Sequence, residues 1–167
     1  HTAMTQHAYI VDDDEAIRDS LEWLLQSRGI PSVAYPSAEA FLEAWNPSFT
    51  GCILLDIRME EMSGTELFER LLEQGCRLPV IFLTGHGDVP MAVSTLKNGA
   101  FDFVEKPCND NKLVDRVVEA LKLDDARRES SASAESILSR LNQLTTRERQ
   151  VMERVLDGKM NKHIADE

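Results

Sequence analysis

The chain has 167 residues, enough for one domain and part of a second. Hydrophobic residues make up 43% and charged residues 28%, a globular balance that excludes wholesale disorder. The net charge of −11 opposes binding to phosphate backbones or anionic lipid unless the basic groups are concentrated. Three scattered cysteines and the lack of a membrane-length apolar run favour a soluble, cytoplasmic protein over a disulfide scaffold or a membrane protein.

Short apolar runs alternate with amphipathic stretches from residue 7 to about residue 123. Three of these runs consist almost entirely of apolar residues, as in parallel strands covered on both faces. The second run along the chain is more polar, as in an edge strand. The expected strands are Ala8–Val11, Ser32–Tyr35, Cys52–Leu55, Val80–Leu83 and Phe103–Val104. Because a helical stretch follows each of them, the pattern predicts an α/β fold with a doubly wound, five-stranded parallel sheet.

Residues suited to cap helices stand at several expected helix ends. Ser37 is expected to cap the second helix and Asn109 the fifth. Asp88 is expected to cap a helix that Pro90 starts and Gly99 ends.

A change of composition after Leu123 divides the chain. Residues 4–123 are expected to form the main domain, and residues 124–140, poor in large apolar side chains, a linker that can be helical. Thr145 and Glu148 form a capping box, so residues 141–167 begin another helical unit. That unit holds five basic and five acidic residues, which places the whole net charge in residues 1–140.

Polar residues follow four of the five expected strands, at the edge where open α/β sheets bind ligands. Asp12–Asp14 follows the first strand, Asp56 the third, Thr84 the fourth and Lys106 the fifth. Carboxylates brought together in this way repel one another unless a cation lies among them. An oxygen site with room for water suits Mg²⁺, so the pattern predicts a magnesium site.

These residues lie in motifs that resemble the receiver domain of two-component response regulators, over about residues 7–123. The motifs are Ile10–Asp13, Leu55–Met59, Thr84–Asp88 and Glu105–Pro107, and the run Thr84–Val93 resembles the FixJ group. The resemblance implies a flavodoxin-like fold with strand order 2-1-3-4-5. It also implies a sensor histidine kinase as the phosphoryl donor.

The resemblance implies a role for each acidic residue. Asp56 is expected to accept the phosphoryl group. Asp13 and Asp56 are expected to ligate Mg²⁺ directly, with the backbone carbonyl of Arg58 as a third protein ligand and Asp12 acting mostly through water.

The resemblance extends to the other strand ends. Thr84 and Lys106 are each expected to bond a phosphoryl oxygen, and the Lys106–Pro107 peptide is expected to be cis. Phe103 stands where the family has a switch aromatic, which turns inward as Thr84 moves. That change would reshape the face of the fourth helix, fifth strand and fifth helix and promote a homodimer through it.

Glu60 departs from the family pattern, which carries proline at this position. Glutamate loosens the backbone of the loop and adds a negative charge near the site. The family pattern therefore does not predict how long the phosphoryl group lasts on this protein or how tightly the protein binds the metal ion. The assignment of Asp56 as the phosphoryl acceptor is unaffected.

The C-terminal segment resembles the start of a LuxR-type helix-turn-helix domain. The resemblance lies in Leu144–Val151, Gly158 and Asn161–Ala165 and implies a truncated, all-α DNA-binding unit over residues 141–167. The intact protein would then be a phosphorylation-switched transcription regulator that binds DNA. It would not be an enzyme, apart from taking part in its own phosphoryl transfer and slow dephosphorylation.

The same residues suggest two other interpretations. In a haloacid-dehalogenase-type phosphatase, Asp12 would be the nucleophile and Asp14 the general acid/base. That family needs a further acidic pair on a strand after the lysine, and none follows Lys106 before the expected sheet ends. A receiver-like binding module that is never phosphorylated is disfavoured by the complete set of acids, threonine and lysine.

Overall fold

The computed structural model describes residues 5–142, with side chains for residues 5–85 and 87–130. The expected capping box and the helix-turn-helix start lie outside the described residues. The chain divides into two units, His1–Ala126 and Arg127–Glu167.

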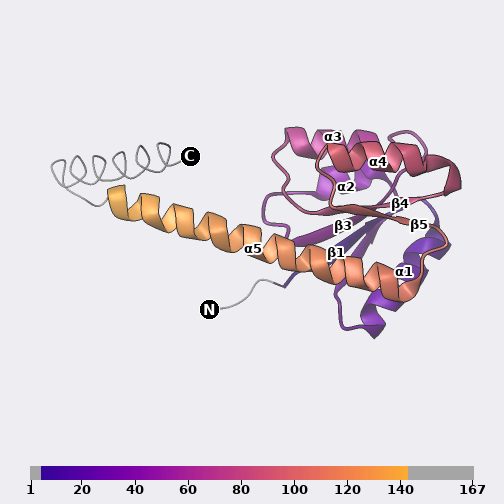
Figure 1. The fold of residues 1–167 in the computed structure, drawn as a ribbon, viewed down its shortest axis with the longest axis horizontal. Helices are drawn as coiled ribbons and strands as arrows, with labels where there is room; N and C mark the ends of the chain where they lie inside the picture. The colour runs from indigo at the N-terminus through magenta and orange to yellow at the C-terminus, as the bar shows by residue number, and fades with distance from the viewer. Residues whose placement is uncertain (1–4, 143–167) are drawn as a thin grey trace, which may run out of the picture. The chain divides into compact units, whose positions relative to one another are not determined.

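Strands and helices alternate along the first unit (Figure 1). In chain order they are β1 (His7–Val11), α1 (Glu15–Ser27), β2 (Ser32–Tyr35), α2 (Ala38–Ala44), β3 (Gly51–Asp56), α3 (Gly64–Glu73), β4 (Val80–Thr84), the short 3₁₀ helix η1 (His86–Asp88), α4 (Val89–Lys97), β5 (Asp102–Glu105) and α5 (Asp110–Asn142). No helix among the described residues is long and apolar enough to cross a membrane.

All five strands are parallel and lie in the order β2-β1-β3-β4-β5. The expected α/β fold and strand order are therefore confirmed, and β2 lies at an edge, as its polar residues predicted. β3 occupies the centre of the sheet, so the residue that ends it is surrounded by the ends of β1 and β4.

Helices cover both faces of the sheet: α2, α3 and α4 lie on one face, and α1 and α5 on the other (Figure 1). Successive strand residues point to opposite faces, so Ile53 and Leu55 belong to one core and Leu54 to the other. Each fully buried leucine or isoleucine contributes about 1.5–3 kcal/mol relative to its exposed state. These two cores hold the strand ends in place.

The helix caps agree with the expectations at two of three positions. Ser37 accepts a hydrogen bond at the start of α2, and Asn109 does so at the start of α5. Asp14 caps α1. The expected cap of α4 is wrong: the side chain of Asp88 makes no capping hydrogen bond and pairs instead with Arg58.

Helix α5 continues without interruption through the stretch that we expected to be a linker. Asp124, the first residue of that stretch, is only 4% exposed. Its Oδ2 accepts hydrogen bonds from the backbone N–H of Gly51 at 2.9 Å and from Nε2 of Gln6 at 3.2 Å. The carboxylate therefore fastens α5 to the start of β3.

Candidate functional site

The register of the strands brings the acidic residues together. Val11 of β1 pairs with Leu55 of β3, so Asp12 and Asp56 follow neighbouring strands side by side. Asp56 in turn pairs with Leu83 of β4. Asp12 and Asp56 are both buried, and the sheet places them at its carboxyl edge.

Lys106 reaches the same point from β5. Its Nζ lies 3.1 Å from Oδ2 of Asp12 and 3.4 Å from Oδ1 of Asp56. Burial alone would lower the pKa of this ammonium group, but the hydrogen bond to Asp12 and the charges of Asp56 and Asp12 outweigh it and raise the pKa. The Lys106–Pro107 peptide is cis, as the family resemblance implied.

The three acids offer a set of oxygens suited to a divalent cation. One carboxylate oxygen from each of Asp12, Asp13 and Asp56 lies within 4.8 Å of the others. Both oxygens of Asp12 already accept hydrogen bonds, from Lys106 and from the backbone N–H of Asp14 at 2.9 Å. Asp13 and Asp56 are thus the acids best placed to ligate a hard cation such as Mg²⁺.

Asp56 has an unusual protonation equilibrium for an aspartate. Burial and the negative charge of Asp12 raise its pKa from 3.8 to about 6, although Lys106 and a hydrogen bond from the backbone of Arg58 oppose the shift. At neutral pH the carboxylate is mostly ionised and can act as a nucleophile. A cation at the site would favour the ionised form further.

The loop between β3 and α3 is held against the site. The backbone N–H of Glu60 donates to Oδ2 of Asp13 at 3.2 Å, a bond that the proline of the family pattern could not make. The backbone N–H of Met62 donates to Oε1 of Glu39 at 2.9 Å. The loop therefore has fixed contacts to the segment after β1 and to α2.

Gly64 is required where α3 begins. Its backbone N–H donates to the carbonyl of Ile57 at 2.8 Å. A Cβ at this position would collide with the backbone carbonyl oxygen of Asp56. Only glycine allows α3 to approach the end of β3 so closely.

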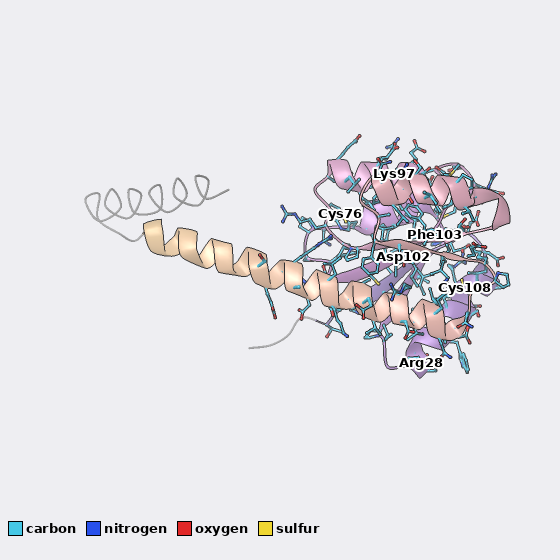
Figure 2. The ribbon with its side chains drawn as sticks, viewed as in Figure 1. Arg28, Cys76, Lys97, Asp102, Phe103 and Cys108 are labelled. Carbon is cyan, nitrogen blue, oxygen red and sulfur yellow. The ribbon has the colours of Figure 1, made fainter. Side chains whose placement is uncertain are left out.

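Thr84 and Phe103 lie where the sequence places them, at the end of β4 and within β5. Thr84 is buried, and its hydroxyl donates to the backbone carbonyl of Gly85 at 3.0 Å. Phe103 is half-buried against the core on the α4 side of the sheet. Figure 2 labels Phe103 and Asp102 on β5, and Asp102 pairs with Arg116 at 3.5 Å.

A cavity of about 590 Å³ adjoins Lys106 between α1 and the start of α5. Its lining includes Ile17, Leu21, Cys108 and Leu113, so it is mainly apolar. Of the residues assigned to the site, only Lys106 lines this cavity.

No pattern in the sequence indicates the pairing between Arg58 and Asp88. The two residues are far apart in the chain, and Asp88 before Pro90 has the pattern of a helix cap. Only the structure reveals the contact: Arg58 Nε lies 2.6 Å from Asp88 Oδ1.

Two protein families match the chain. Residues 8–118 match the response regulator receiver domain. Residues 142–167 match the bacterial regulatory proteins of the luxR family.

Named relatives agree with these matches. The chain is 46% identical to the C4-dicarboxylate transport transcriptional regulatory protein DctR of Rhodobacter capsulatus, over 98% of this chain and 84% of the relative. It is 43% identical to the transcriptional regulatory protein FixJ of Bradyrhizobium diazoefficiens, over 96% of this chain and 78% of the relative.

Solved structures are similar as well. The response regulator StyR matches with a TM-score of 0.85 at 37% identity, over 98% of this chain and 82% of that one. Full-length FixJ from B. japonicum matches with a TM-score of 0.71 at 39% identity, over 99% and 83%. The chain therefore belongs to the response regulators of two-component systems that join a receiver domain to a LuxR-type DNA-binding domain.

Proposed function

We propose that this response regulator is switched by phosphorylation of Asp56, with a sensor histidine kinase as the donor. The observation that carries the proposal is the position of Asp56 at the end of the central strand, between the acids that follow β1 and the ammonium group of Lys106. A buried carboxylate with a cation on one side and metal-type ligands on the other is equipped to attack phosphorus.

In the proposed reaction, an oxygen of Asp56 attacks the phosphorus of a phosphohistidine. The new O–P bond forms as the P–N bond breaks, and the electron pair of that bond leaves with the imidazole. Lys106 pairs with one phosphoryl oxygen, and the hydroxyl of Thr84 turns from the Gly85 carbonyl to donate to another. Positioning and charge supply most of the catalysis.

Asp13, Asp56 and the backbone carbonyl of Arg58 are the proposed protein ligands of Mg²⁺, with Asp12 acting through water. The spacing of the three carboxylates supports this assignment, as does the fact that both oxygens of Asp12 already accept hydrogen bonds. When bound, Mg²⁺ offsets negative charge on the phosphoryl oxygens.

Phosphorylation is further proposed to change the face formed by α4, β5 and α5. Phe103, half-buried beside the α4 core, turns inward as Thr84 moves and thereby promotes a homodimer through this face. Asp102 of β5 and Arg116 of α5, which pair within the chain at 3.5 Å, are partly exposed on this face.

The remaining assignments follow from the family. Residues 4–123 are proposed as the receiver, 124–140 as the linker and 141–167 as part of the DNA-binding domain. The protein is proposed to act on DNA in the cytoplasm as a transcription regulator, and its only catalytic role is in its own phosphoryl transfer and dephosphorylation.

Mass spectrometry tests the proposal. Incubation with a small phosphodonor and Mg²⁺ should add one phosphoryl group to the wild type and none to Asp56→Asn, whereas Asp12→Asn should only weaken labelling. Labelling of Asp56→Asn but not of Asp12→Asn would favour the phosphatase alternative. That alternative already has a weakness, because Asp14, its general acid/base, caps α1.

A further inference from the structure

One ion pair ties the loop after Asp56 to the start of α4. Nε of Arg58 lies 2.6 Å from Oδ1 of Asp88. The side chain of Asp88 is only 8% exposed, whereas that of Arg58 is 75% exposed. A carboxylate with so little contact to water is costly without a charged partner, so Arg58 stabilises Asp88 in this position.

The short segment Gly85–Asp88, which joins β4 to α4, is fastened at both ends. At its start, the hydroxyl of Thr84 donates to the carbonyl of Gly85 at 3.0 Å. At its end, Asp88 pairs with Arg58 and makes no capping bond to α4. The donors in these two contacts are the hydroxyl of Thr84 and the guanidinium of Arg58. A phosphoryl group on Asp56 can compete for both donors.

We propose that Arg58 is shared between two anions, Asp88 and the phosphoryl group of Asp56, and that phosphorylation releases the segment Gly85–Asp88 by drawing Arg58 away. The inference rests on the proposed phosphorylation of Asp56. Arg58 is suited to this role because it follows Asp56 by two residues and because most of its side chain is exposed to solvent.

Charge favours the exchange. A phosphoryl group carries about −1.5 to −2 charge and three strong acceptor oxygens, against a single charge on a carboxylate. A guanidinium can donate two parallel hydrogen bonds to such a group. Arg58 therefore gains interaction energy when it moves to Asp56.

The exchange has a structural consequence because Asp88 is buried. Once Arg58 leaves, the carboxylate of Asp88 has lost its cation and must move toward water, which displaces η1 and the first turn of α4. The pair thus couples charge at Asp56 to the position of α4.

Binding of beryllofluoride, a phosphoryl mimic, to the full chain in the presence of Mg²⁺ tests the proposal. Calorimetry should show that Asp88→Asn, which removes the competing charge, binds the mimic about three- to tenfold more tightly than the wild type. Arg58→Ala, which removes the shared cation, should bind it more weakly by a similar factor. The matched control is Arg70→Ala, which breaks an exposed pair with Glu66 on α3 and should leave binding unchanged.

The opposite signs are the decisive result. If the pair were only a structural contact, breaking it from either side would change affinity in the same direction, and that outcome would overturn the proposal. Hydrogen–deuterium exchange of residues 85–97 gives a second readout. Without the mimic, Arg58→Ala should exchange several-fold faster there than the wild type, and unchanged exchange would also contradict the proposal.

Labelling separates this inference from the proposed function. If the wild type gains no phosphoryl group on Asp56 from a small phosphodonor, the proposed function fails and the inference fails with it. If Asp56 is labelled but the two variants shift affinity in the same direction, only the sharing of Arg58 is overturned.

Discussion

Nζ of Lys106 lies 3.4 Å from Oδ1 of Asp56. The contact opposes the two effects that raise the pKa of Asp56, namely burial and the charge of Asp12. Lys106 is therefore a determinant of how much of Asp56 is ionised, in addition to its proposed contact with the phosphoryl group.

Replacing Lys106 should raise the pKa of Asp56 further. In Lys106→Met the aliphatic part is kept and the charge is lost, so the pKa should move above its wild-type value of about 6. Titration of the Asp56 carboxyl carbon by NMR measures this directly. Lys122→Met, which changes an exposed lysine on α5, serves as the control, and an unchanged or lower pKa in Lys106→Met would contradict the expectation.

The raised pKa of Asp56 also predicts how stability depends on pH. Between pH 3.8 and about 6 the folded state keeps a proton that the unfolded state releases, so this group lowers stability as pH rises through that interval. Asp56→Asn should therefore unfold with a free energy about 1–3 kcal/mol above that of the wild type at pH 8.

The advantage of Asp56→Asn should shrink as the pH falls below 6, because the wild-type carboxyl then becomes protonated. Urea unfolding at several pH values measures the difference. A difference that does not change between pH 8 and pH 5 would show that the ionised carboxylate is not what destabilises the fold.

Magnesium should stabilise the folded protein through the same carboxylates. A ligand that binds only the folded state at one hundred times its Kd adds about 2.7 kcal/mol to the free energy of unfolding. Asp13→Asn should lose most of this gain, since Asp13 is one of the two carboxylates proposed to ligate the ion directly. Thermal unfolding with and without Mg²⁺ measures the gain, and an equal gain in both proteins would exclude Asp13 as a ligand.

Gly64→Ala should destabilise the protein and disturb the site together. The added methyl group collides with the backbone of Asp56, so we expect a loss of roughly 1–3 kcal/mol and slower labelling of Asp56. Gly87→Ala is the matched control because a Cβ there meets no atom within 4 Å. Equal stability of the two variants would mean that α3 can shift without cost.

Much of the fold could be predicted because its signals are local. The apolar runs, the polar residues that follow them and caps such as Ser37 are readable from neighbouring positions. The carboxyl ends of parallel strands meet at one edge, so Asp12, Asp56 and Lys106 could be placed together before any coordinates.

Contacts between residues far apart in the chain could not be predicted from the sequence. Asp88 has the pattern of a cap, but its partner Arg58 comes from another loop, and no local pattern encodes that contact. Asp124 begins a polar stretch, and no local pattern indicates that tertiary packing buries its side chain against Gly51. In both cases one acidic residue finds its donor far away in sequence.

The buried contact of Asp124 gives the last prediction. Asp124→Ala leaves the backbone N–H of Gly51 without this acceptor, so the free energy of unfolding should fall by about 1–3 kcal/mol. Asp124→Asn keeps an oxygen in the same place and should cost less. The control is Asp115→Ala on the exposed side of α5, which should stay within about 0.5 kcal/mol of the wild type. Urea unfolding decides between these values. If Asp124→Ala were as stable as Asp115→Ala, the hydrogen bond to Gly51 would not be what fastens α5 to the start of β3.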